Sequence, residues 1–130
     1  MKKQLYDYPT WKRVKKLASL VKGEKVLDIG CSPCLLKCFL PQKMRYYGFD
    51  QKNATCYFPG IKIYRGDISK NNNLPTSLKK QSFDTVVLGE TLEHLKNPTE
   101  ALSNTFKLLK PGGKLVGSCP NSLAWRFFLV

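Results

Sequence analysis

The sequence predicts an α/β protein built on a parallel sheet. Apolar runs of strand length alternate with segments whose apolar residues recur at helical spacing. Three of these runs end in or next to an aspartate, at Asp28, Asp50 and Asp67. The 130 residues, 42% of them apolar, fit one domain with its own core. No internal repeat or low-complexity linker divides the sequence, so residues 1–130 are expected to form a single domain.

The first half of the chain is expected to contain two helices and three strands. Val14, Leu17 and Val21 share one face at helical spacing, with lysines on the other faces, which predicts an amphipathic helix. Ser32 and Pro33 have the residue types of a helix N-cap and first helical position. The expected elements are a helix within residues 1–23, a strand at 24–29, a helix at 33–40, a strand at 46–49 and a strand at 61–64.

The second half continues the alternation. A polar stretch interrupted by Pro75 predicts a crossover loop or short helix, and an almost continuously apolar run then predicts a strand covered on both faces. Asn97 and Glu100 have the spacing of a capping box at the start of a helix, which Pro111 and the glycines after it should end. The expected elements are the crossover at 69–81, a strand at 83–88, a helix from 97 to about 110, a strand at 114–118 that completes a core of residues 24–118, and an apolar tail at 119–130.

Strand ends of this kind indicate a ligand site. Parallel strands joined by right-handed crossovers bring their carboxyl ends to one edge of the sheet, where ligands bind. Gly30 lets the chain turn there without a side chain in the way. Asp50 follows Gly30 by about twenty residues, the separation at which a nucleotide-binding fold places a carboxylate on ribose hydroxyls. We therefore expect Asp28, Asp50 and Asp67 to surround a nucleotide-type ligand.

Five segments together carry a family resemblance. In chain order they read VLDIGCSPC, YYGFD, YRGDI, SFDTVVLGETLEHLKNP and LLKPGGKLVGSCPN, within residues 24–121. These segments resemble the successive motifs of class I S-adenosylmethionine-dependent methyltransferases, and are most similar to the branch that includes the ubiquinone and menaquinone biosynthesis enzymes. The resemblance implies a Rossmann-like, doubly wound parallel sheet of strand order 3-2-1-4-5. It also implies a chain truncated after strand five, without the C-terminal strands of the full family fold.

The resemblance further implies a cofactor site for S-adenosylmethionine. The first motif would hold the methionine end of the cofactor, the second its ribose and the third its adenine. The fourth motif would be the part of the protein chain that passes beneath the cofactor. The residues implied, in that order, are Asp28, Gly30, Cys31 and Ser32; Asp50 and Gln51; Asp67 and Ile68; and Leu88, Gly89 and Glu90. The family usually has glycine where this sequence has Ser32 and Cys34, so the Cys34 side chain could collide with the methionine moiety.

His94 and Glu90 are the candidate catalytic residues. Methyl transfer from a sulfonium is a direct displacement, so an enzyme chiefly aligns the nucleophile and excludes water. Where the acceptor is a hydroxyl, a histidine could remove its proton, with Glu90 or Glu93 beside it. The alternative is that the two glutamates favour a helix start and that His94 is a surface or packing residue.

The cysteines do not predict a metal centre. Cys31, Cys34 and Cys38 have gaps of two and then three residues, and the sequence offers no matching fourth ligand. Five cysteines in a chain that begins without a secretory signal favour reduced thiols and a cytoplasmic location. We therefore expect no disulfide framework, no bound metal and no membrane span.

A formal net charge of +13 raises the question of an anionic partner. Clustered basic residues bind the phosphates of RNA or an anionic membrane surface. However, 18 of the 22 basic residues are lysine, which a nucleotide bias of the genome also explains. The apolar tail at 119–130 suggests packing against strand five or a homodimer formed through that strand.

Three functions remain open from the sequence. The first is methyl transfer to a small-molecule acceptor, such as a quinone precursor, with RNA as a less favoured acceptor. The second is a truncated, catalytically inactive module or scaffold that still binds the cofactor. The third, a nicotinamide-dependent reductase, is disfavoured because the GxGxxG pattern fails after Gly30.

Overall fold

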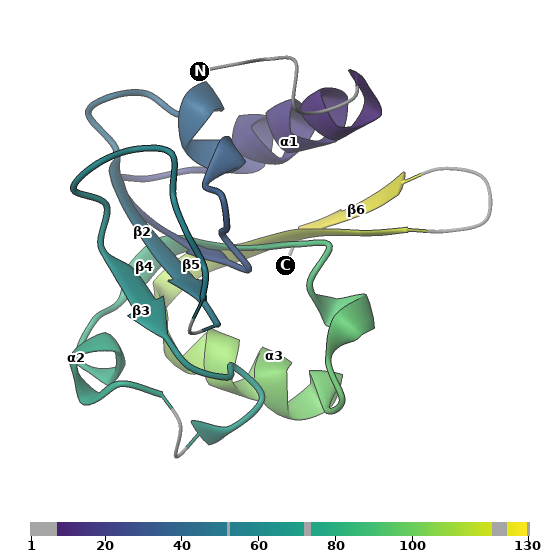
Figure 1. The fold of residues 1–130 in the computed structure, drawn as a ribbon. Helices are drawn as coiled ribbons and strands as arrows, with labels where there is room; N and C mark the ends of the chain where they lie inside the picture. The colour runs from purple at the N-terminus through teal and green to yellow at the C-terminus, as the bar shows by residue number, and fades with distance from the viewer. Residues whose placement is uncertain (1–7, 52, 72–73, 121–124, 130) are drawn as a thin grey trace.

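The computed structural model describes residues 8–51, 53–71, 74–120 and 125–129, and it shows a six-stranded sheet (Figure 1). The strand order is β3-β2-β1-β4-β5-β6. The first five strands are parallel, which confirms the predicted order 3-2-1-4-5, and β6 runs antiparallel to β5. The strands are β1 (Lys25–Ile29), β2 (Arg45–Asp50), β3 (Ile63–Arg65), β4 (Phe83–Gly89), β5 (Leu109–Pro120) and β6 (Trp125–Leu129).

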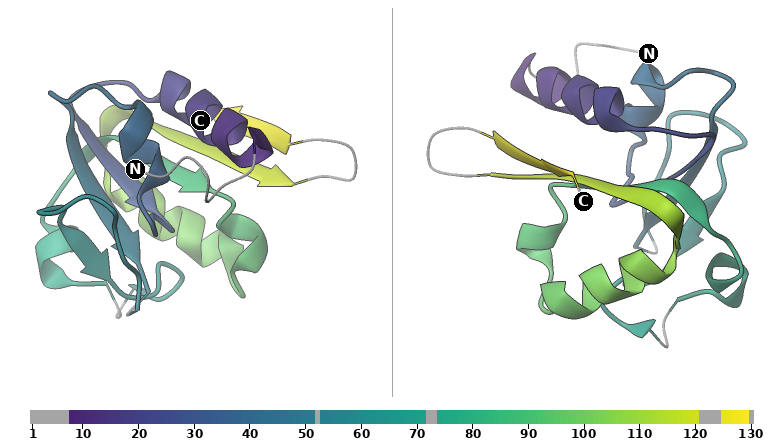
Figure 2. Two further views of the ribbon diagram at one scale, coloured as in Figure 1. Left: turned by 45° about the horizontal axis from the view of Figure 1, so that its top comes forward. Right: turned by 180° about the vertical axis from the view of Figure 1, so that it is seen from behind.

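Helices cover both faces of the sheet (Figure 2). On one side lie α1 and the short 3-10 helix η2, and on the other lie α2 and α3. A further 3-10 turn, η4, follows β4. The bounds are α1 (Tyr8–Leu20), η2 (Leu35–Phe39), α2 (Thr76–Lys79), η4 (Leu92–His94) and α3 (Pro98–Lys107). None of the helices in the described residues is long and apolar enough to cross a membrane.

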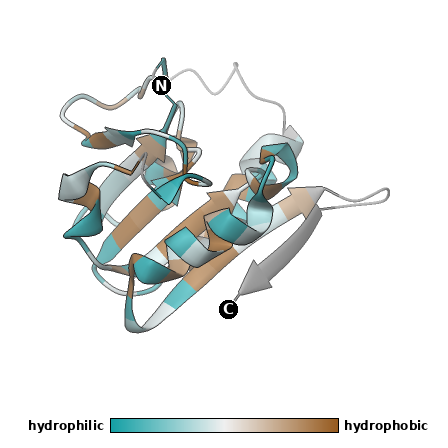
Figure 3. Cartoon of the chain, turned by 90° about the horizontal axis from the view of Figure 1, so that it is seen from below, coloured by the Kyte–Doolittle hydropathy of each residue, from teal (hydrophilic) through white to brown (hydrophobic). Residues whose placement is uncertain are grey.

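Alternation along the strands explains the two cores. Val26 of β1 packs with Leu17 of α1, whereas its neighbour Leu27 packs on the face covered by α2 and α3. Successive side chains of a strand point to opposite faces, so a strand buried on both faces must be apolar almost throughout. Strand β4 meets this condition from Thr85 to Leu88, all buried. Figure 3 shows hydrophobic strand segments beneath the mixed surface of α3.

Two predicted helices differ from the structure. Residues 33–40 form only the 3-10 helix η2, whose N-cap is Cys34 rather than Ser32. The Ser32 hydroxyl instead accepts a hydrogen bond from the Thr55 backbone N–H, so it ties two loops together and caps no helix. Helix α3 begins as predicted, with Asn97 as its N-cap, but ends at Lys107 rather than near Lys110. Helix α3 ends there because Leu109 already belongs to β5, where it pairs with Phe83 of β4.

Strand β5 is longer than the predicted strand at 114–118. The Pro-Gly-Gly sequence lies within it, where the ladder shifts register between Phe83 and Thr85. A Cβ on Gly113 would stand 2.9 Å from the Lys110 carbonyl oxygen, so the glycine lets the irregular strand stay close to its own turn. Residues 125–129 of the apolar tail lie against β5, the first of the two arrangements expected for the tail, and they do so as the antiparallel strand β6. Residues 121–124 and 130 lie outside the described residues, as do 1–7 of the predicted N-terminal helix.

Candidate active site

A cavity of about 570 Å³ opens at the carboxyl edge of the sheet. The ends of β1, β2 and β3 form one side, and the segment from η4 into α3 forms the other. Five residues implied for the ribose, adenine and loop contacts line this cavity: Gly30, Asp50, Gln51, Asp67 and Ile68. The three strand ends named by the sequence are therefore brought to one site, as parallel topology requires.

A smaller cavity of about 120 Å³ lies on the α1 side of the same edge. The residues implied for the methionine end and the chain beneath it line this cavity: Asp28, Gly30, Cys31, Ser32, Gly89 and Glu90. Gly30 lines both cavities, so the two spaces adjoin at the turn after β1. Leu88 lines neither cavity, because its fully buried side chain packs in the core beneath α3.

The turn after β1 is held by its neighbours on both sides. The backbone N–H groups of Gly30 and Cys31 donate to the Phe49 carbonyl oxygen, at 2.8 and 3.3 Å. The Thr91 hydroxyl lies 3.1 Å from the Ile29 carbonyl oxygen and 3.2 Å from the Gly89 carbonyl oxygen. Gly30 has φ of +75°, a conformation that favours glycine. These contacts fix the point at which the two cavities meet.

Asp50 is oriented by backbone groups of its own loop and of the loop after β1. Its Oδ2 accepts from the Ser32 N–H at 2.8 Å, and its Oδ1 accepts from the Gln51 N–H at 2.7 Å. A carboxylate has about four lone-pair positions, so these two bonds leave acceptor capacity at the cavity. Arg65 closes the same loop by donating to the carbonyl oxygens of Gln51 and Ala54. Asp50 is thus held in place at the cavity with acceptor capacity to spare.

The disulfide between Cys34 and Cys56 contradicts the expectation that these thiols are reduced. Cys34 is fully buried, lines neither cavity, and has φ of +75°, which glycine adopts freely. The Cys34 side chain, which was expected to approach the methionine moiety, is instead bonded to Cys56 in the loop after β2. Spacing alone could not reveal this pair, because its halves belong to loops that meet only in the fold. The described residues contain no group of three or more His, Cys, Asp or Glu side chains that could hold a metal ion.

Asp67 and Ile68 are fixed at the opposite end of the larger cavity. Asp67 Oδ1 accepts from the Ser69 hydroxyl at 2.6 Å and from the Ser69 N–H at 2.9 Å. The side-chain hydrogen bond from Ser69 is the main cause that holds the pKa of Asp67 below its ordinary value. The carbonyl oxygen of buried Ile68 accepts from Asn104 Nδ2 of α3 at 2.8 Å. This loop therefore presents an ionised carboxylate and an anchored backbone to the cavity.

The surroundings of Asp28 strongly shift its pKa. Burial raises the pKa of Asp28 to about 7, and the negative charge of Asp50 adds to the effect. The Tyr46 hydroxyl opposes this rise in pKa by donating to Asp28 Oδ2 at 2.5 Å. Burial also raises the pKa of the Cys31 thiol to about 12, so Cys31 is neutral at physiological pH.

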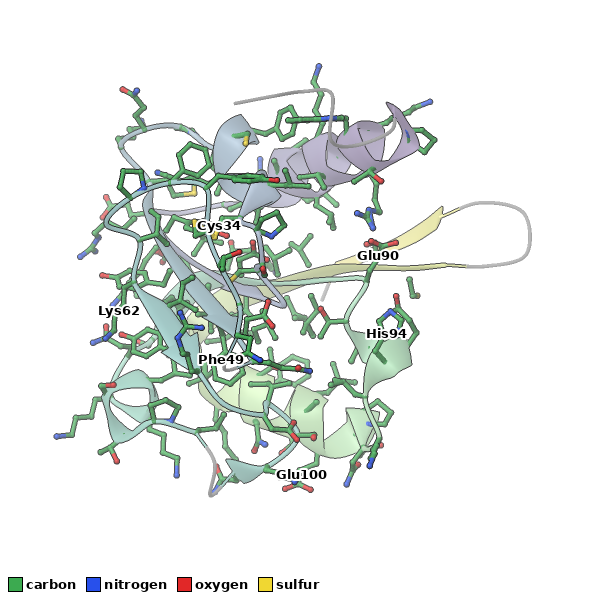
Figure 4. The ribbon with its side chains drawn as sticks, in the orientation of Figure 1. Cys34, Phe49, Lys62, Glu90, His94 and Glu100 are labelled. Carbon is green, nitrogen blue, oxygen red and sulfur yellow. A yellow bond between two sulfur atoms is a disulfide. The ribbon has the colours of Figure 1, made fainter. Side chains whose placement is uncertain are left out.

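The two predicted catalytic residues occupy different parts of the site. Glu90 points toward α1 and forms an ion pair with Arg13, whose side chain is only 9% exposed (Figure 4). His94 lies on η4, lines the larger cavity and is 78% exposed at its side chain. Its Nε2 stands 3.8 Å from a carboxylate oxygen of Glu93. The structure therefore brings His94 to the cavity but engages Glu90 elsewhere.

Sequence reasoning missed three residues of this site: Arg13, Tyr46 and Thr91. Arg13 lies four residues before the buried Leu17, so a cation on the apolar face of α1 was a signal that could have revealed it. Tyr46 and Thr91 gave no such signal, because a tyrosine in a strand and a threonine in a loop are ordinary. Their roles depend on the partners they meet in three dimensions.

Comparison with known proteins identifies the family. A protein-family model described as "Methyltransferase domain" matches residues 2–126 of this sequence. The chain belongs to this methyltransferase domain family. This domain is 30% identical over 111 residues to a protein of Mycolicibacterium smegmatis named "Probable S-adenosylmethionine-dependent methyltransferase", covering 85% of this chain and 43% of that protein. It is 28% identical over 105 residues to the ubiquinone biosynthesis O-methyltransferase of Pseudomonas fluorescens, covering 76% of this chain and 45% of that enzyme.

Solved structures confirm the fold of this methyltransferase domain. The plantazolicin methyltransferase BpumL, solved in complex with SAH, has a TM-score of 0.62 at 14% identity, and the match covers 87% of this chain and 47% of that one. The fold is accordingly that of class I methyltransferases, as the motifs implied. The chain spans less than half the length of the two curated relatives above.

Proposed function

We propose that this methyltransferase domain binds S-adenosylmethionine across its two cavities. The observation that carries the proposal is their junction at Gly30, with Asp50, Asp67 and Ile68 around the larger space and Asp28 at the smaller one. The larger cavity suits an adenosine group, with the ribose at Asp50 and the base near Asp67 and Ile68. The smaller cavity suits the amino-acid end.

The acidic group at the smaller cavity fits the ammonium of an amino acid. Asp28 lines this cavity and is more than nine-tenths buried. A buried carboxylate needs compensation, which an ammonium near Asp28 would supply, whereas Arg13 of the same cavity is already paired with Glu90. When bound, the cofactor supplies an electrophilic methyl group on a sulfonium. The residues of this chain would hold its two ends, exclude water and align the acceptor.

We further propose a small molecule with an oxygen or nitrogen nucleophile as the methyl acceptor. Support comes from His94, the one histidine of the sequence, which lines the larger cavity from η4 and could take a proton from a hydroxyl. Glu90 is not proposed as its partner, because Arg13 engages that carboxylate. This engagement favours the second candidate function, a module that binds the cofactor without catalysis.

Calorimetry with S-adenosylhomocysteine tests cofactor binding. Asp50→Ala should weaken binding by about 1 to 3 kcal/mol, because hydrogen bonds to a charged acceptor are lost. Glu24→Ala is a matched control, since this exposed carboxylate lies just before β1, at the opposite edge of the sheet from the cavities. Absence of heat and of a thermal shift at millimolar ligand would refute the proposed cofactor.

Methyl transfer is tested with radiolabelled S-adenosylmethionine and a panel of catechols, hydroxyquinone precursors and unmodified tRNA. Labelling of a hydroxylated small molecule that falls steeply in His94→Gln, with cofactor affinity retained, is the expected result. Binding of cofactor without labelling of any acceptor would instead support the non-catalytic module. Labelling of tRNA alone would replace the small-molecule acceptor by RNA.

A further inference from the structure

A buried hydrogen bond joins Tyr46 of β2 to Asp28 of β1. The Tyr46 hydroxyl donates to Asp28 Oδ2 at 2.5 Å, and the two residues are only 6% and 7% exposed. In the parallel ladder Asp28 pairs with Gly48, two residues after Tyr46, so the two side chains lie on the same face of the sheet. The side chain of Tyr46 therefore reaches Asp28 diagonally across neighbouring strands.

Gly48 of β2 and Cys31 after β1 restrict the geometry of this pair. A Cβ on Gly48 would stand 2.6 Å from the Cys31 sulfur atom, so the Cys31 side chain occupies the place where a larger residue opposite Asp28 would point. Tyr46 and Cys31 both pack in the core cluster on the α1 side. The phenol is thus fixed by packing, and its hydroxyl holds one oxygen of Asp28 in a single place. Asp28 itself lines the smaller cavity.

The charged and titratable groups around Asp28 act in opposite directions. Asp50 at the end of β2 favours the neutral acid by repulsion, and burial favours it more strongly. Cys31 stays a neutral thiol, while Arg13 of α1 and Glu90 after β4 line the same cavity as an ion pair. The phenol of Tyr46 favours the carboxylate, because it donates to the charged form. Removing the Tyr46 hydroxyl should therefore raise the pKa of Asp28 further, because this hydrogen bond no longer opposes burial and the charge of Asp50.

We propose that Tyr46 is a positioning residue that favours the carboxylate form of Asp28 and orients it toward the ammonium group of the bound cofactor's amino-acid end. The inference rests on the proposed function, and it gives a role to Tyr46, a residue of the YYGFD segment to which the motifs assigned none. Asp28 makes the direct contact, and Tyr46 acts through it. Without such a donor a larger fraction of the buried aspartate would be protonated at neutral pH, and that fraction would offer the ammonium group no charge.

The test compares Tyr46→Phe with Tyr47→Phe in the whole chain. Tyr47 is the matched control, because it is the next residue of β2 and packs in the core cluster of the opposite face, where its ring stacks on Tyr64 at 6.3 Å between centroids. S-adenosylhomocysteine binding is measured by calorimetry from pH 6 to pH 8.5, and the Asp28 carboxyl group is titrated by ¹³C NMR in the ligand-free protein.

In the wild type, affinity should rise with pH through about 7, where Asp28 ionises. Loss of one hydrogen bond to a charged group should move this midpoint up by about one pH unit in Tyr46→Phe. The variant would then bind about five-fold more weakly at pH 7 and nearly as well as wild type at pH 8.5. Tyr47→Phe should follow the wild-type profile, and Asp28→Asn should lose the pH dependence.

Two results would overturn the inference. A Tyr46→Phe profile that superimposes on the wild type would show that the hydroxyl does not act on Asp28. Weakening by the same factor at every pH, with an unchanged carboxyl titration, would show a merely structural effect. If the wild type binds no S-adenosylhomocysteine, the proposed function fails. The NMR titration of the ligand-free protein then still decides whether Tyr46 sets the charge of Asp28.

Discussion

Substituting Gly30 by alanine should destabilise the fold through a specific collision. Gly30 has φ of +75°, where an alanine costs about 1 to 2 kcal/mol. Its Cβ would also stand 2.5 Å from the Thr91 hydroxyl oxygen. That hydroxyl lies at 3.1 and 3.2 Å from two backbone carbonyl oxygens, and displacing it would cost about 1 kcal/mol more. We therefore expect a loss of about 2 to 3 kcal/mol in the free energy of unfolding.

Gly60 provides the matched control for this prediction. Its φ is +76°, and nothing lies within 4 Å of the Cβ that an alanine would add. Gly60→Ala should therefore carry the backbone cost alone, about 1 to 2 kcal/mol. Urea unfolding gives both values, and their difference isolates the collision with Thr91.

A double-mutant cycle locates the effect. In a Thr91→Ala background, Gly30→Ala should cost no more than Gly60→Ala, because the hydroxyl that it would meet is gone. If Gly30→Ala and Gly60→Ala are equally destabilising in the wild-type background, the close approach of Thr91 to the turn has no energetic consequence. The argument from the structure would then be refuted.

Two further predictions concern stability. The pKa of Asp28 is raised by burial to about 7 in the folded protein, so the folded state binds the extra proton between about pH 4 and pH 7. The contribution of Asp28 to stability should therefore fall as pH rises through this window, and Asp28→Asn should compare more favourably with wild type at pH 8 than at pH 5 in urea unfolding. The disulfide between Cys34 and Cys56 spans a sequence separation of 22, so Cys56→Ser should cost about 3 kcal/mol. A dithiol reductant should lower the melting temperature of the wild type and leave that of Cys56→Ser unchanged; equal responses would contradict the pairing.

Local signals explain why much of the fold was predictable. The apolar run before Gly30, the alternation of strands and helices, and the Asn97 cap each depend on residues close together in sequence. Element ends were less predictable, because pairing across the sheet decides them. Leu109 joins β5 beside Phe83 although the preceding helical pattern could have continued. Ser32 has the residue type of an N-cap, but its hydroxyl is taken by the loop after β2.

The sequence by itself determined which strand ends carry the carboxyl groups of the two cavities, since Asp28, Asp50 and Asp67 end or follow apolar runs that parallel topology brings to one edge of the sheet. Only the tertiary structure decided what each charge faces. The Tyr46 hydroxyl reaches Asp28 from the neighbouring strand, and Arg13 of α1 engages Glu90 after β4. Such pairs depend on strand register, helix placement and side-chain rotamers. No local pattern encodes these, because the partners meet only when distant segments pack.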